Sequence, residues 1–202
     1  GASALMQGLA DGYFVLPYTI QNYLSKEIYS QPIPTTVPEF EAAEKAVAEK
    51  IEKLMSIKGA KSVDSFQKEL GHIMWNKVGM GRTAEGLKEA VPMLQALKEE
   101  FWQNVRITGD TTSMNPELEK ALRLSDHIEL AQLMAKDALH REESCGGHFR
   151  EEHQTEEGEA KRNDEQFMYV AAWEYQGENA EPQLHKEELN YEFIKVQQRN
   201  YK

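Results

Sequence analysis

The sequence predicts a mainly α-helical protein. We expect an antiparallel three-helix bundle of the spectrin-repeat kind, preceded by one apolar helix and followed by a small irregular tail with one or two strands. Apolar residues recur three and four positions apart in long segments before residue 141, which is the period of an amphipathic helix. Residues 142–164 are charged and contain three glycines, so regular helix is expected to stop there. A run rich in aromatic and β-branched residues follows, which is typical of a strand.

Composition limits the class of protein. The 202 residues are 40% hydrophobic and 28% charged, which fits one globular domain, or one domain with part of another. The net charge of −11 argues against binding to nucleic acid or to anionic lipid, because both depend on Lys and Arg. The single cysteine, Cys145, excludes an internal disulfide and fits a reducing compartment.

The first predicted helix spans residues 1–24, where Asp11 is the only charged residue. The segment lacks the basic start of a secretory signal, and it has too many polar groups for a membrane span. A helix that is apolar on every side needs to be buried. Two interpretations stay open: the chain is a C-terminal piece of a longer protein, or it is complete and this helix packs on its own bundle.

A linker and a further helix follow. Residues 32–38 hold three prolines and are expected to be extended. Thr36 and Glu39 form a capping-box pattern for the next helix, which we expect to end near Lys58 and Gly59. Its predicted inward residues are Phe40, Ala43, Val47, Ile51 and Leu54.

Three more helices are predicted over residues 62–77, 83–105 and 116–141. Pro92 lies within the second of these and is expected to kink or split it. Asn115 and Pro116 are a typical N-cap and first helical residue for the third. The predicted inward residues are Phe66, Leu70, Ile73 and Met74, then Leu87, Val91, Leu94, Leu97, Phe101 and Val105, then Ala121, Leu124, Ile128, Ala131, Ala135 and Ala138.

The tail is expected to begin with a long loop over residues 142–164. Residues 167–175 are predicted to form a strand, residues 177–182 a turn, and residues 189–196 a second strand that pairs back. The predicted domains are therefore residues 1–30, the helical bundle of residues 31–141, and the tail of residues 142–202.

Reactive side chains gather in the loop, where His140, Cys145, His148 and His153 lie among glutamates. Zinc binds His and Cys, but the ligand spacings of structural zinc sites are missing, so we predict no metal site. A thiol nucleophile at Cys145 with His148 as its base is also disfavoured, because nearby acidic residues keep a thiol protonated.

Most other polar and aromatic residues have structural explanations. Most of the carboxylates of residues 39–52 and 142–165 are expected on solvated faces with Lys partners. The three tryptophans are predicted to be core or interface residues; they are Trp75, Trp102 and Trp173.

Several segments together resemble one family. Residues 1–9 look like the helix that closes the FAD-binding domain of succinate dehydrogenase and fumarate reductase flavoprotein subunits. Residues 143–148 (Glu-Ser-Cys-Gly-Gly-His) resemble the family's Glu-Ser-Arg-Gly-Ala/Gly-His stretch. Residues 162–165 and 191–194 are similar to the segments around its last strands. The order and spacing of these segments carry the resemblance over nearly the whole chain.

The resemblance implies a C-terminal fragment in which residues 1–30 are the truncated last helix of the FAD-binding domain. The catalytic residues would lie upstream of residue 1. Cofactor contact would be limited to Ala4 and Leu5, where the family usually has Ser-Leu, and Ala4 could contribute only its backbone. Cys145 stands where the family has Arg, which puts any role of that charge in doubt.

The resemblance also implies a function. The parent protein would interconvert succinate and fumarate by hydride transfer with FAD and pass electrons to an iron–sulfur subunit and quinone, whereas the isolated chain is expected to be inactive and to bind no FAD. Its partners would be the FAD-binding and capping domains and the iron–sulfur subunit, with no nucleic acid and no membrane span. The location would be cytoplasmic, at the inner face of the membrane through partner subunits. The alternatives are a fragment of an L-aspartate oxidase-like flavoenzyme and a stand-alone helical interaction module.

Overall fold

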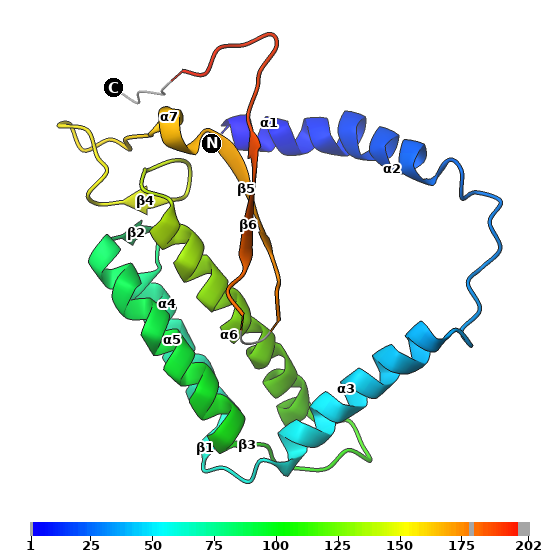
Figure 1. Ribbon diagram of the computed structural model, residues 1–202. Helices are drawn as coiled ribbons and strands as arrows, with labels where there is room; N and C mark the ends of the chain where they lie inside the picture. The colour runs from blue at the N-terminus through cyan, green and yellow to red at the C-terminus, as the bar shows by residue number, and fades with distance from the viewer. Residues whose placement is uncertain (1, 178–179, 198–202) are drawn as a thin grey trace. The chain divides into compact units, whose positions relative to one another are not determined.

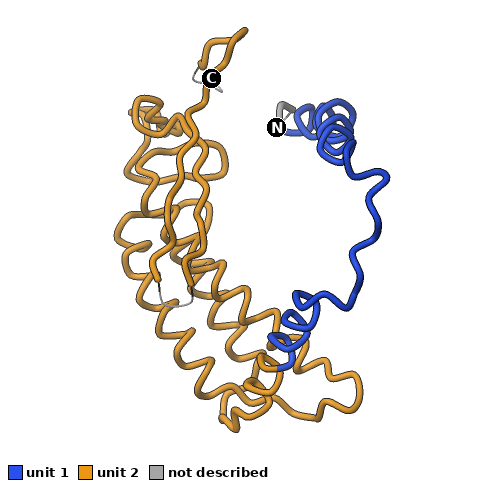
Figure 2. Tube along the Cα trace, turned by 45° about the vertical axis from the view of Figure 1, so that its right-hand side comes forward, with its two compact units in different colours: residues 1–48 blue, residues 49–202 orange. Residues whose placement is uncertain are grey.

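The computed structural model describes residues 2–177 and 180–197. The chain separates into two compact units, residues 1–48 and residues 49–202 (Figure 2). None of the helices in the described part of the chain has the length and apolar character that crossing a bilayer requires.

The first unit begins with an unbroken helical run. It consists of α1 (Ala2–Ala10), a π-helical turn η1 (Asp11–Val15) and α2 (Leu16–Leu24), so the predicted first helix is confirmed. No residue of η1 or α2 is buried. Large apolar side chains are exposed along the run, including Leu5, Met6, Leu9, Tyr13, Phe14, Leu16, Ile20 and Leu24.

Helix α3 (Pro38–Ser56) leads from the first unit into the second. It begins at Pro38, so Thr36 is not the residue directly before the helix, as the capping-box pattern had suggested. Leu54 is buried as predicted, but Phe40 and Val47 are exposed. The prediction that they point into a core is wrong: they lie on the part of α3, residues 38–48, where the structure describes no buried side chain.

The second unit is built on three antiparallel helices, α4 (Val63–Lys77), α5 (Ala84–Asn104) and α6 (Pro116–His140) (Figure 1). Each starts with a side-chain cap: Ser62 accepts from Ser65 N, Thr83 from Gly86 N, and Asn115 from the amides of Glu117 and Leu118. The predicted bundle is confirmed, and its core is made by the predicted stripes. Its largest members are Leu54, Phe66, Leu87, Leu94, Phe101, Leu124 and Ile128.

Helix α5 is continuous through Pro92, so the predicted split does not occur. Proline removes one amide donor and leaves the carbonyl four residues earlier without its helical partner. Pro92 lies on the exposed side of α5, where water can satisfy that carbonyl.

Two short parallel strand pairs tie the ends of the bundle together. At one end β1 (Lys61–Ser62) pairs with β3 (Val105–Arg106). At the other end β2 (Gly81–Arg82) pairs with β4 (Phe149–Arg150). The second pair brings residues of the predicted loop against the turn between α4 and α5.

The tail contains α7 (Asp164–Phe167) and an antiparallel pair, β5 (Tyr169–Glu174) and β6 (Gln183–Glu188). The first predicted strand is confirmed by β5. The second was placed at residues 189–196, which is wrong. Strand β6 lies earlier, in register from Tyr169 opposite Glu188 to Glu174 opposite Gln183. The predicted turn at 177–182 includes residues 178 and 179, which lie outside the described residues.

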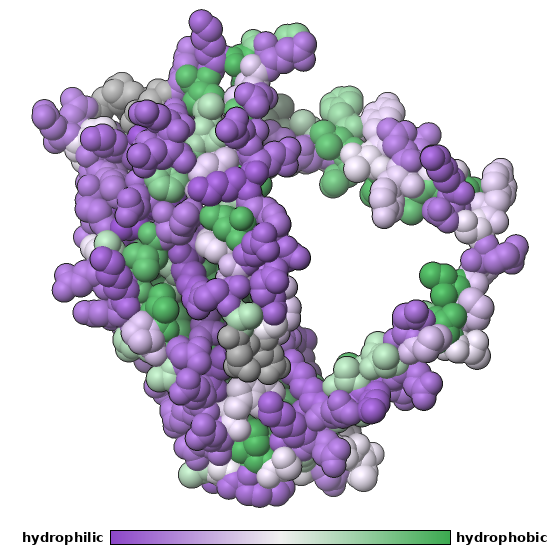
Figure 3. Space-filling view, in the orientation of Figure 1, coloured by the Kyte–Doolittle hydropathy of each residue, from purple (hydrophilic) through white to green (hydrophobic). Residues whose placement is uncertain are grey.

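The three tryptophans have different surroundings. Trp173 donates from Nε1 to Asp137 Oδ1 at 2.8 Å, and Trp102 packs edge-on against Phe101. Trp75 is 84% exposed and is therefore no core residue. The face of the second unit seen in Figure 3 is mostly hydrophilic, with scattered apolar side chains.

Candidate functional site

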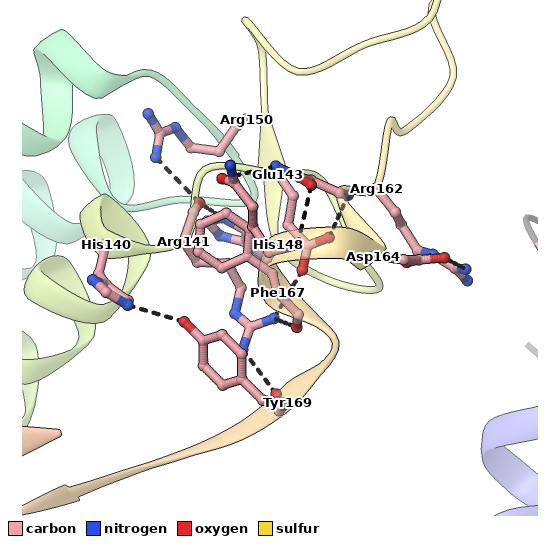
Figure 4. Close-up of polar contacts among 11 residues, drawn as sticks. His140, Arg141, Glu143, His148, Arg150, Arg162, Asp164, Phe167 and Tyr169 are labelled. Atoms are coloured by element: carbon pink, nitrogen blue, oxygen red, sulfur yellow. Dashed lines mark hydrogen bonds and ion pairs between the residues drawn. The ribbon is translucent and has the colours of Figure 1, made fainter. Parts of the chain in front are cut away.

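The segment from Glu142 to Phe167, called the clasp below, follows Arg141, the C-cap residue of α6, and folds over the C-terminal end of that helix (Figure 4). It contains the Glu-Ser-Cys-Gly-Gly-His stretch and was expected to be a charged loop. The described structure instead shows an ordered arrangement with buried charges, built from β4, α7 and the turns between them.

In the part of the chain that the structure describes, Arg150 is the least exposed charged residue, with 2% of its side chain exposed. Its Nη1 donates to the carbonyl oxygens of Ala138 at 3.0 Å, Leu139 at 3.4 Å and Arg141 at 3.3 Å. The last carbonyls of a helix have no helical donor and carry partial negative charge. The guanidinium therefore caps α6 from inside the protein.

The same guanidinium is neutralised by Glu152. Arg150 Nε and Nη2 donate to Glu152 Oε1 at 3.0 and 2.6 Å. That oxygen also accepts from Ala84 N, at the start of α5, at 2.7 Å. Burial alone would raise the pKa of Glu152, but the hydrogen bonds from Arg150 and the backbone lower it below the usual value. This pair links the end of α6 to the beginning of α5.

A second buried pair lies beside the first. Glu143 is 3% exposed and accepts from Arg141 Nη1 at 2.8 Å and from Asn163 N at 2.8 Å. Arg141 also donates to the carbonyls of Phe167 at 3.1 Å and Tyr169 at 3.2 Å. The prediction of a solvated carboxylate is therefore wrong for Glu143. Its role is to hold the two ends of the clasp together.

Ser144 closes the turn between these two pairs. Its buried hydroxyl donates to Arg150 O at 3.1 Å and accepts from Arg150 N at 2.8 Å. The next residues form a tight turn in which Cys145 and His148 exchange backbone hydrogen bonds. Gly146 has φ +59° there, which is the left-handed region that glycine adopts at little cost.

His148 is fixed by a single strong contact. Its Nε2 lies 2.8 Å from the carbonyl oxygen of Arg141, so this nitrogen carries the proton. Burial lowers the pKa of His148, the hydrogen bond to Arg141 O opposes this in part, and the positive charges of Arg82, Arg150 and Arg141 lower the pKa further, so that it lies below the usual histidine value. Only Nδ1 is then free to act as a base, and among the described residues no side-chain hydrogen bond joins His148 to Cys145, whose contacts with His148 are between backbone atoms.

The other reactive side chains of the cluster have separate surroundings. Cys145 is exposed, and partial burial of the thiol and the charge of Glu143 raise its pKa. His140 Nε2 lies 3.0 Å from the hydroxyl of Tyr169. No group of three His, Cys, Asp or Glu side chains suited to a metal ion occurs in the part of the chain that is described.

Ala4 and Leu5, the residues predicted to contact FAD, lie in the first turns of α1. The side chain of Ala4 has no polar atom, and Leu5 is 78% exposed. A helix start offers unpaired amides, but these two residues do not by themselves make a flavin site.

Sequence reasoning missed the structural importance of Arg141, Arg150 and Glu152. The available signal was the placement of Arg150 and Glu152 two residues apart, directly after the Gly-Gly turn. Local patterns do not reveal which charges of such a run are buried, because their partners are carbonyls and amides at the ends of distant helices.

Comparison with known proteins gives a consistent result. Residues 67–201 match the family described as fumarate reductase flavoprotein C-term. An uncharacterized FAD-dependent oxidoreductase of Methanocaldococcus jannaschii is 32% identical over 54% of this chain and 19% of its own length. The fumarate reductase flavoprotein subunit of a Serratia species is 30% identical over 67% of this chain and 22% of its own length.

A solved structure of the Escherichia coli quinol fumarate reductase has the same fold, with a TM-score of 0.70 and 23% identity over 84% of this chain and 28% of that chain. The chain spans about a fifth of the length of the two curated relatives.

Proposed function

Since the chain belongs to the fumarate reductase flavoprotein C-terminal family, we propose that it forms the C-terminal helical region of an FAD-dependent oxidoreductase that interconverts succinate and fumarate. The observation that carries this proposal is the family match over residues 67–201. It covers α5, α6 and the clasp, which contains the buried pair Arg150–Glu152 and also Glu143, the buried partner of Arg141.

The geometry of the clasp supports this proposal. Three residues of the stretch that resembles the family motif each have a distinct place: Glu143 pairs with Arg141, Ser144 binds the backbone of Arg150, and His148 donates to Arg141 O. A motif in which these three side chains are engaged by other parts of the chain is suited to building a domain. We therefore assign the chain a bracing role in the flavoprotein.

The helical run α1–η1–α2 is the proposed point of connection to the flavin domain. Its exposed apolar side chains, such as Leu9, Phe14 and Leu16, form a surface that water does not favour. In the proposed flavoprotein this surface packs against the FAD-binding domain, and the backbone of Ala4 and Leu5 lies against the cofactor.

The chemistry belongs to the flavin and to parts of the flavoprotein other than this chain. FAD supplies hydride transfer, and protein groups bind and orient the substrate. We assign no catalytic residue to this chain and expect it to be inactive alone, even with added FAD. Transfer of electrons to an iron–sulfur subunit and quinone, and attachment to the cytoplasmic face of the membrane through such subunits, complete the proposal.

The test begins with the protein in its source cells. Antiserum raised against the 202-residue chain is used to isolate the native protein, whose mass, flavin absorbance and succinate-dependent dye reduction are then measured. We expect a protein much larger than the 23.1 kDa chain, with bound flavin and activity that malonate, a succinate mimic, inhibits.

The recombinant chain with FAD is the matched control and is expected to give no activity above a protein-free blank. A native protein of 23.1 kDa without flavin would overturn the proposal and favour a stand-alone interaction module. Flavin with activity toward aspartate, but not succinate, would instead favour an L-aspartate oxidase-like enzyme.

A further inference from the structure

The clasp contains one ionisable group that is surrounded by positive charge. His148 lies in the turn before β4, and its ring meets the end of α6. Arg150 Nη1 lies 3.3 Å from the same Arg141 carbonyl oxygen that accepts from His148 Nε2. The imidazole and the buried guanidinium are therefore neighbours that share one acceptor.

Three arginines on different elements place positive charge near this imidazole. Arg150 belongs to β4, Arg141 follows α6, and Arg82 belongs to β2. The acidic groups nearby are already engaged by these arginines: Glu152 binds Arg150 and Glu143 binds Arg141. Asp137, on α6, attracts Arg82 and accepts from Trp173.

We propose that His148 is an acid-sensitive latch, which holds the clasp on the end of α6 while its imidazole is neutral and loosens the clasp when the imidazole takes up a second proton. The hydrogen bond from Nε2 to Arg141 O survives that proton. The loosening comes from a new positive charge placed among three guanidiniums in a partly buried site, where charge repulsion is poorly screened.

The direction of the pH dependence follows from the surroundings. The docked clasp lowers the pKa of His148 relative to an exposed histidine, so the docked state binds the proton more weakly than the open state. Docking is therefore fully stabilised above the usual histidine pKa, and this stabilisation is lost as the pH falls. When His148 is protonated in both states, each pH unit by which its pKa in the docked state lies below its pKa in the open state weakens docking by about tenfold.

Hydrogen–deuterium exchange on the 202-residue chain tests the latch. Exchange is compared at about pH 7.5 and pH 5.0, with labelling times scaled for the intrinsic rate of amide exchange. In the wild-type chain, amides of residues 144–163 are expected to lose protection by threefold or more at the lower pH. The core amides of α4 and α5 are expected to keep theirs.

Two variants separate His148 from other groups that titrate in this range. His148→Gln keeps an amide donor near the position of Nε2 but takes up no proton, so its clasp is expected to stay protected at pH 5.0. His153→Gln makes the same change within the clasp, away from the shared carbonyl, and is expected to behave as the wild type. Equal loss of protection in His148→Gln and wild type would overturn the proposal.

A direct titration serves if His148→Gln does not fold. The ring protons of His148 are followed by NMR in the wild-type chain while clasp amides are observed in the same spectra. We expect a His148 midpoint below about 6.5, the ordinary histidine value, that coincides with the change in the clasp amides. A midpoint at or above that value, or clasp amides that do not change with it, would overturn the latch.

Discussion

At position 150 the chain places a permanently charged side chain inside the protein. The arrangement is stable because the N–H groups of the guanidinium have partners on two edges. Nη1 donates to carbonyls at the end of α6, and Nη2 donates to Glu152. A buried charge without such partners is strongly unfavourable. The same partners make the site sensitive to substitution, since any change leaves carbonyls, a carboxylate or both without their donor.

Arg150→Met is expected to reduce the free energy of unfolding by about 3 kcal/mol, because it leaves Glu152 and the end of α6 without their shared donor. Urea denaturation followed by circular dichroism measures the change. Arg123→Met is the control, since Arg123 is 73% exposed and pairs with Glu119 one turn away; its cost is expected to be below about 1 kcal/mol. Equal costs for the two variants would contradict the capping role of Arg150.

Cys145 is accessible but is expected to be a poor nucleophile. Partial burial and the charge of Glu143 raise its thiol pKa, so less thiolate is present at a given pH than in a free cysteine. We expect iodoacetamide to modify the folded chain several-fold more slowly at about pH 8 than the same chain in urea. A native thiol that reacts as fast as the unfolded one would show that its surroundings do not suppress ionisation.

At the scale of elements, two glycines show how the same substitution has opposite effects. A Cβ atom at Gly59 would lie 1.9 Å from the carbonyl oxygen of Asn104, where β1 and β3 join the ends of α3 and α5. At Gly71, on the exposed side of α4, nothing lies within 4 Å of such a Cβ. Gly59 is required because the backbone of Asn104 approaches it closely, whereas Gly71 has no such neighbour and only lowers the stability of α4.

Gly59→Ala is therefore expected to lower the free energy of unfolding by about 2 kcal/mol or more, because the backbone has to move. Gly71→Ala is expected to raise it by about 0.5–1 kcal/mol through helix propensity. The urea midpoints of both variants, compared with the wild type, measure the difference. A destabilised Gly71→Ala or a neutral Gly59→Ala would contradict the packing described at that position.

The elements also show what the sequence predicts well. Helices α4, α5 and α6 were predicted close to their observed positions, because a long apolar stripe and a capping residue are local signals. Strand β6 was misplaced because its position depends on register with β5 and not on its own alternation. The buried pairs of the clasp were missed for a related reason: Glu143 and Arg150 find their partners only after the helices have assembled.

At the scale of the molecule, the two units differ in how they are held together. The buried apolar core runs from Leu54 to Ala138 and lies wholly in residues 49–202. In residues 4–48 the structure describes no buried side chain. The larger unit therefore has a core of its own, whereas the described residues 4–48 of the first unit form none.

This difference predicts a specific pattern of proteolysis. Residues 25–37 are exposed or nearly so and lie outside regular helix, so their backbone enters a protease site without unfolding a core. Brief digestion with proteinase K is expected to remove residues before about 37–49 and leave a product that retains the clasp, as mass spectrometry would show.

The rate of this cleavage is to be compared between the isolated chain and the native flavoprotein. In the proposed flavoprotein, the run α1–η1–α2 packs against the flavin domain. Cleavage of the peptide bonds in residues 25–37 then requires opening of that interface. We therefore expect it to be many-fold slower than in the isolated chain. Equal cleavage rates in the two proteins would mean that the first unit stays exposed in both. The apolar run would then need a different partner, and the proposed junction with the flavin domain would be wrong.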